Sequence, residues 1–143
     1  MTVAAILAGK GRNVVTTSAA TPVAEAVAML AEHKIGALVV SEGAQRISGI
    51  VSERDIVRAL AKGGAAIMDG PVSAIMTRDV VTCADGDSIN DVMSEMTRGR
   101  FRHLPVVSNG RLSGIVSIGD VVKARMGQVE REAEDMRAYI ATA

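Results

Sequence analysis

The hydrophobic pattern alternates between short apolar runs, typical of strands, and the spacing of helices with one buried face. In the first half, it predicts six elements in order: a short apolar helix (3–7), a β-branched strand (14–17), a helix (23–32), a buried strand (35–40), another strand (47–51) and a helix from Ser52 through Leu60. Gly63 and Gly64 are expected to end the last helix, and 64–71 is interpreted as a linker.

The second half repeats this order. Its predicted elements are a short helix (72–76), a β-branched strand (80–82), a helix capped by Ser88, two strands (103–107 and 112–116) and a helix capped by Ser117. The helix after Ser88 carries four apolar residues on one face: Ile89, Val92, Met93 and Met96. Asn109-Gly110 indicates a two-residue hairpin turn, so the second hairpin loop is expected to be one residue shorter than the first.

Neither half is long enough to bury a good core alone, because small domains bury too little of their surface. We therefore expect a mixed α/β (α+β) fold. In it, two β-α-β-β-α repeats pack sheet to sheet as a pseudo-twofold pair, followed by a C-terminal helical extension. The predicted divisions are a first repeat with its N-terminal helix (1–63), a linker (64–71), a second repeat (72–126) and an amphipathic helical tail (127–143).

One phrase occupies the same place in both halves: Gly-Ile-Val-Ser, two further residues and an aspartate, at 49–55 and at 114–120. The local interpretation is a helix N-cap, in which the serine accepts a hydrogen bond and the acid stabilises the first turn. The functional interpretation is compatible with it. A carboxylate at such a turn can accept hydrogen bonds from a ribose diol, and the serine and helix N–H groups can hold a phosphate. One copy is weak evidence, but an internal repeat is informative.

Two stretches carry more apolar surface than one sheet can cover. The helix at 23–32, expected to have Pro22 as its first residue, has only two charges, Glu25 and Glu32, and this favours a homodimer. The C-terminal stretch has an apolar seam with alternating spacings of four and three residues: Val122, Met126, Val129, Ala133, Met136 and Ile140. The seam is compatible with a tail packed on its own or a partner's body, or with a short two-chain coiled coil.

Composition narrows the function classes. Sixteen basic and sixteen acidic residues cancel, and Phe101 and Tyr139 are the only phenylalanine and tyrosine in a chain without tryptophan. Neither a basic surface nor an aromatic stacking platform for nucleic acid is therefore expected. No apolar run approaches membrane-spanning length and the start lacks the features of a signal peptide, so we expect no membrane partner and a cytoplasmic location.

The reactive side chains indicate no catalytic centre. Cys83 is the only cysteine and is interpreted as a small apolar residue, and the two histidines form no cluster with metal-site spacing. The chain has no recognisable nucleophile–base pair and no phosphate loop with a lysine. We therefore expect no metal, no catalytic cofactor and no enzymatic activity.

The doubled phrase, the order of elements and the half-length near sixty residues together resemble the CBS domain, named for cystathionine β-synthase. The resemblance covers about residues 3–126, and it includes Leu104-Pro105-Val106-Val107 in the second half; the first half has Leu38-Val39-Val40 without the proline. CBS pairs bind adenine nucleotides in two clefts between their repeats. The resemblance thus implies a regulatory module that senses AMP, ADP, ATP or NAD(H), with AMP favoured, and signals by a change in shape.

The resemblance also implies which residues line each cleft. The first cleft would use Ser52, Asp55, Met76, Thr77, Val80, Arg102 and His103, and the second would use Lys10, Val14, Gly36, Ala37, Ser117 and Asp120. The adenine would lie between aliphatic side chains.

The two clefts differ in predicted charge. Arg102 and His103 match the basic pair that contacts phosphate in nucleotide-binding relatives, whereas the corresponding Gly36 and Ala37 are uncharged. The first cleft is expected to prefer AMP, and the second to bind it more weakly unless Lys10 compensates. Two alternatives stay open: an interaction subunit with degenerate pockets, whose protein target is unidentified, and a less favoured small nucleotide hydrolase.

Overall fold

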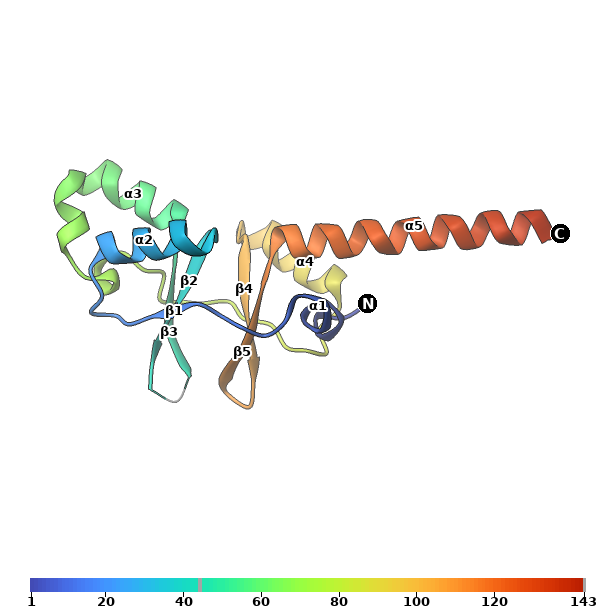
Figure 1. The fold of residues 1–143 in the computed structure, drawn as a ribbon, viewed down its shortest axis with the longest axis horizontal. Coiled ribbons are helices and arrows are strands. Elements are labelled where there is room, and N and C mark those ends of the chain that lie inside the picture. The colour runs from blue at the N-terminus through green and yellow to red at the C-terminus, as the bar shows by residue number, and fades with distance from the viewer. Residues whose placement is uncertain (44, 143) are drawn as a thin grey trace.

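The computed structural model describes residues 1–43 and 45–142, and it contains two small sheets flanked by helices (Figure 1). The first sheet has the order β1 (Thr16–Thr17), β2 (Ala37–Glu42), β3 (Arg46–Ser52), in which β1 is parallel and β3 antiparallel to β2. The second sheet is the antiparallel pair β4 (His103–Ser108) and β5 (Arg111–Ser117). The two hairpins lie side by side, with β3 in contact with β5. The predicted α/β architecture of two repeats is confirmed.

The helices follow the predicted order. The five α-helices are α1 (Val3–Lys10), α2 (Val23–His33), α3 (Glu53–Gly63), α4 (Ile89–Gly99) and α5 (Ile118–Thr142). Two 3₁₀ helices, η1 (Gly64–Asp69) and η2 (Val72–Ala74), replace much of the predicted linker and the short helix predicted at 72–76. Pro22 is the N-cap of α2 with extended backbone, instead of its first residue. No helix in the described part of the chain is long and apolar enough to cross a membrane.

The strand predicted at 80–82 is wrong, because that segment makes only an isolated parallel bridge between Cys83 and Val106. The Cys83 N–H donates to the Pro105 carbonyl, and the Val107 N–H donates to the Cys83 carbonyl. The next bond of a parallel ladder would need an N–H from Pro105 towards the Val81 carbonyl, and proline has none. The sequence contained this signal, since the first half has Val39 where the second has Pro105.

The second hairpin closes as the sequence predicts. Asn109 and Gly110 both have positive φ, 53° and 76°, which is the backbone of a type I′ turn. Both hairpins also carry an irregularity in register at corresponding places, between Val40 and Ser41 and between Val106 and Val107.

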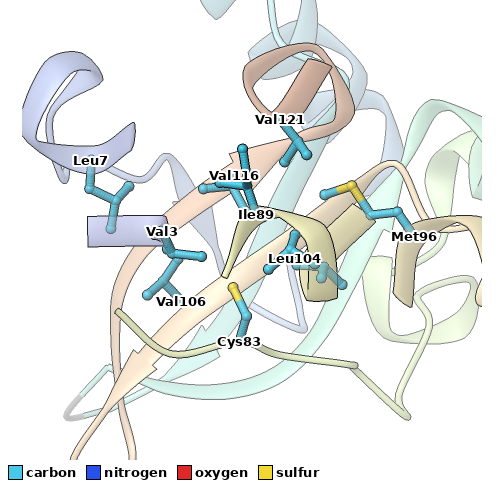
Figure 2. Close-up of a cluster of buried hydrophobic side chains, with 10 residues drawn as sticks. Val3, Leu7, Cys83, Ile89, Met96, Leu104, Val106, Val116 and Val121 are labelled. Carbon is cyan, nitrogen blue, oxygen red and sulfur yellow. The ribbon is translucent and has the colours of Figure 1, made fainter. Parts of the chain in front are cut away.

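Each core is completed by the segment at the N-terminal end of the other repeat. Val3 and Leu7 of α1 lie in the core of the second repeat, among α4, β4, β5 and the start of α5 (Figure 2). Val72 and Met76, at the start of the second repeat, lie in the core of the first. Because these segments cross between the halves, the two repeats are interlocked. The division into residue ranges given above stays a prediction, and the crossing does not follow from it.

The glycine of the repeated phrase is required where each crossing segment lies on the sheet. A Cβ at Gly114 would come within 2.9 Å of Leu7 Cδ1, and one at Gly49 within 2.6 Å of Met76 Sδ. Both distances are below normal contact, so a side chain at either position would push the crossing segment away.

The long helix α5 packs on the body only through its first turns. Val121 is fully buried and Ala124 partly so, whereas the helix beyond them extends away from both sheets (Figure 1). Five seam residues have between 44% and 66% of their surface exposed: Val122, Met126, Val129, Met136 and Ile140. The tail therefore does not pack on its own body, and the alternatives that involve a partner are left.

Candidate functional site

The first repeated phrase forms a complete capping box at the start of α3. Asp55 Oδ2 accepts hydrogen bonds from the Ser52 N–H at 2.9 Å and from Ser52 Oγ at 3.0 Å, and the Asp55 N–H donates to Ser52 Oγ. The other carboxylate oxygen, Oδ1, accepts from Thr77 Oγ1 at 3.1 Å. Thr77 is held there because it bridges Ile50 of β3 with two backbone hydrogen bonds. The structure thus brings together Ser52, Asp55 and Thr77, three of the residues expected in the first cleft, and their role in binding stays a prediction.

The second phrase caps α5 in the same way. Asp120 Oδ2 accepts from the Ser117 N–H at 2.9 Å, and the Asp120 N–H donates to Ser117 Oγ. The partner from the opposite repeat is Lys10, whose Nζ lies 2.6 Å from Asp120 Oδ2 and 3.0 Å from the Ile115 carbonyl oxygen. Burial acts to raise the pKa of Asp120, but the hydrogen bonds from Lys10 and Ser117 and the charge of Lys10 outweigh it, so the pKa is lowered.

The remaining aliphatic residues of the predicted clefts, Met76, Val80 and Val14, lie close to Thr77 or Lys10 in the sequence. Met76 is buried over Gly49, beside Thr77. Val80 and Val14 are half-buried. Neither is joined to the capping residues by a hydrogen bond or ion pair within the described residues, so their place in a cleft stays a prediction.

The starts of β2 and β4 approach each other between the two caps. The His103 imidazole packs against Gly36, where a Cβ would lie 3.1 Å from the His103 Cε1 atom and 3.7 Å from Glu53 Oε1. Ala37 is buried beside Gly36, and Arg102 is exposed. His103 therefore contacts Gly36, a residue predicted for the other cleft, and it lies between the clefts more than within one. Glu53 was missed by sequence reasoning, although it occupies a variable position of the repeated phrase.

His103 is expected to be neutral at pH 7. Burial lowers its pKa; Glu53 and Asp120 act to raise it, and Lys10 and Arg102 act with burial to lower it. The hypothesis that a protonated His103 contacts phosphate is therefore not supported, which leaves the charge of that basic pair on Arg102. Cys83 is also unreactive, because burial first, and then Asp87 and Asp85, raise the pKa of its thiol to about 12.

One apolar groove begins beside the first cap, where Gly36 and Glu53 contribute to its lining. It has a volume of about 520 Å³ between α2 and α3, and its lining includes Val27, Leu30, Ile56 and Val57. Val57 is 63% exposed, so this groove is open to a partner. No group of three or more His, Cys, Asp or Glu residues in the described ranges could hold a metal ion.

Comparison with known proteins identifies both repeats. The family model of the CBS domain matches residues 10–62 and 72–127. An uncharacterised 17.7 kDa protein of Acidianus ambivalens is 38% identical over 120 residues, which cover 80% of this chain and 71% of that protein. The mitochondrial CBS domain-containing protein CBSX3 of Arabidopsis thaliana is 35% identical over 81% of this chain, and the match spans 58% of that protein.

Solved structures match over most of the chain. A CBS-domain protein of Agrobacterium tumefaciens superposes with a TM-score of 0.85 at 49% identity, covering 87% of this chain and 99% of that one. The CBS domain protein PAE2072 of Pyrobaculum aerophilum, solved as a complex with AMP, has a TM-score of 0.74, 31% identity and coverages of 84% and 89%. The CBS domain pair of MJ0100, solved with 5′-methylthioadenosine and S-adenosyl-L-methionine, has a TM-score of 0.78, 26% identity and coverages of 90% and 98%.

Proposed function

The chain belongs to the CBS domain family, and from this premise we propose that it is a regulatory module that binds adenine nucleotides in two clefts between its repeats. AMP is the ligand we favour, with ADP, ATP or NADH as further candidates. The observation that carries the proposal is the duplicated carboxylate. Asp55 and Asp120 each stand at a helix start, and each is bonded to a residue near the start of the opposite repeat.

This geometry suits a ribose phosphate. A carboxylate can accept about four hydrogen bonds, so Asp55 keeps capacity for a ribose hydroxyl beside its bonds to Ser52 and Thr77. The positive end of the α3 dipole favours a phosphate in the same place. The site lies where two repeats meet, so a ligand held there contacts both.

The relatives support the same class of ligand. One related CBS protein was crystallised with AMP and another with two adenosyl compounds, all of which contain adenosine. Their shared chemistry is a ribose joined to adenine, which is what an accepting carboxylate between aliphatic walls would recognise.

We propose that binding acts by coupling and not by catalysis. A ligand that contacts both repeats stabilises the arrangement in which its two sets of contacts are made together. An unidentified protein target would then distinguish the occupied from the empty arrangement.

A homodimer is proposed from two unpartnered surfaces. The first is the groove between α2 and α3, which the exposed Val57 lines, together with the exposed Leu60 further along α3. The second is the α5 seam.

The charges beside the seam distinguish two ways of pairing α5. In a parallel pair with the seam as its core, Arg125 of one helix would face Glu130 of the other, and Glu132 would face Arg137. An antiparallel pair with overlapping seams would bring Glu130 to Glu130 and Glu132 to Glu132, and like charges are destabilising. The charges therefore favour the parallel arrangement.

Calorimetry of AMP against the full chain and its Asp55→Asn and Asp120→Asn variants tests the function. Asparagine keeps the shape of the carboxylate but loses its charge, so each variant should weaken one site by roughly ten- to a hundred-fold. Circular dichroism must show that both variants are folded, since each also loses part of a helix cap. Two variants that bind like the parent would reduce the carboxylates to caps, and no binding by the parent would favour an interaction subunit. Consumption of the nucleotide would point to an enzyme.

A further inference from the structure

The two clefts differ in the group that reaches the aspartate from the opposite repeat. In the first it is the neutral hydroxyl of Thr77, and in the second it is the ammonium of Lys10. The two residues hold similar but not aligned places: they are 67 residues apart, whereas Thr17 and Cys83, which make the matching parallel bridges, are 66 apart. The group that reaches the repeated aspartate is thus a hydroxyl in one cleft and a cation in the other.

The ammonium is bonded but within reach of a ligand. Lys10 Nζ uses two donors, one to Asp120 Oδ2 and one to the Ile115 carbonyl, and an ammonium has three. The side chains of Lys10 and Asp120 are 34% and 25% exposed. A partly exposed ion pair contributes little net stability, so exchanging its partners costs little. Asp120 Oδ1 accepts no protein hydrogen bond within the described residues, so a ligand hydroxyl can approach it.

We propose that Lys10 selects for anionic ligands in the Asp120 cleft, whereas the Thr77 cleft also accepts neutral nucleosides. A ligand that carries phosphate or another anion offers the ammonium a new partner while its ribose takes the Asp120 carboxylate. A neutral nucleoside offers no such exchange, and it meets a carboxylate whose charge is already balanced by Lys10. This inference rests on the proposed function and deepens it.

The inference gives content to the exception named in the sequence analysis. Gly36 and Ala37 are uncharged, and for that reason the second cleft was expected to be the weaker site for AMP unless Lys10 compensates. Lys10, at the end of α1, gives this cleft a cation 2.6 Å from the carboxylate proposed to bind ribose.

The competing explanation is that Lys10 is a clamp that ties α1 to β5. The bond to the Ile115 carbonyl fits that role equally well. The two explanations differ in the ligands they affect. Loss of a clamp changes the stability of the chain and the affinity of all ligands alike. Loss of a selectivity residue changes the ratio of AMP affinity to adenosine affinity.

The test exchanges the two groups that reach the aspartates, because Lys10 in one cleft can be replaced by threonine and Thr77 in the other by lysine. We would titrate AMP and adenosine into the full chain by calorimetry, using Asp55→Asn or Asp120→Asn to silence one cleft at a time. Lys10→Thr should raise adenosine affinity in the Asp120 cleft and lower its AMP-to-adenosine ratio by about ten-fold or more, and Lys10→Arg should keep the parent ratio. Thr77→Lys should raise the ratio in the Asp55 cleft. Thermal unfolding of each variant reports folding separately.

The outcomes distinguish failure of the selectivity role of Lys10 from failure of the proposed nucleotide-binding function. If AMP and adenosine bind both clefts but the Lys10→Thr ratio stays within two-fold of the parent, the selectivity role is refuted and Lys10 is a clamp. Since Thr77→Lys introduces a longer side chain, a variant that fails to fold leaves Lys10→Thr to decide. If the parent binds no adenine compound in either cleft, the proposed function itself fails, and the inference with it.

Discussion

Leu7→Ala tests the interlocking of the repeats, because Leu7 precedes the first repeat in sequence but lies in the core of the second. Its side chain is 1% exposed and lies on Gly114, which has no side chain to fill the space that would be left. Truncation of a buried leucine costs about 2–5 kcal/mol, and poor relaxation places a site in the upper half of that range. We therefore expect a loss of about 3–5 kcal/mol, a large share of the roughly 5–15 kcal/mol of a typical domain.

Denaturant unfolding measures the size of this effect, and native-state hydrogen exchange measures its location. Protection should fall first in β4 and β5, although the substitution lies more than 90 residues away in sequence. Met76→Ala is the reciprocal variant and should reduce protection in β2 and β3, since Met76 lies in the first core. Ala8→Ser, on the exposed side of α1, is the control and should change stability by about 0.5 kcal/mol or less. Loss of protection in β2 and β3 on Leu7→Ala, with β4 and β5 unchanged, would refute the crossed cores.

Three further predictions follow from the site and the tail. Because the pKa of His103 is lowered in the folded chain, the unfolded chain binds the proton more readily. The contribution of His103 to stability should therefore be full above about pH 6.5 and should fall as the pH drops. Unfolding temperatures of the parent and of His103→Gln at pH 7.5 and 5.5 measure this difference. Cys83 should resist a thiol reagent at pH 8 until the chain unfolds, since its thiol pKa is about 12; rapid labelling of the native protein would contradict its burial. On oxidation, Met136→Cys should form a disulfide between two copies, because this seam position meets itself only in a parallel pair. Electrophoresis without reductant detects that link, and a chain that stays monomeric at micromolar concentration in light scattering would argue against the pair.

Local chemistry made much of the fold predictable. Ser52 and Ser88 cap their helices as expected because side-chain capping depends on neighbours in sequence. Asn109-Gly110 likewise specified its own turn. The failures arose where a partner distant in sequence decides the outcome: the missing N–H of Pro105 ended a strand predicted elsewhere in the chain.

The members of the candidate site were predicted from two sources. The repeated phrase identified Asp55 and Asp120, because a duplicated motif is visible in sequence. The grouping of Lys10 with Asp120 came from the family resemblance, because their bond spans 110 residues and no periodicity indicates which aspartate a lysine will reach. His103 packs against Gly36 across the repeat interface, so the burial that lowers its pKa cannot be predicted from the pattern of one strand.

The helix α5 begins at the proposed second cleft, so a small rotation there would be carried along the whole helix. Its first turn contains Asp120, and its remaining turns leave the body without a break through Thr142. At about 1.5 Å per residue, its 25 residues form a rod roughly 37 Å long. A tilt of about 5° at the cap would move the far end by about 3 Å, by the geometry of a rod of that length. A small displacement around the Asp120 carboxylate would thus become a larger displacement at the C-terminal end of α5, where a second molecule could detect it.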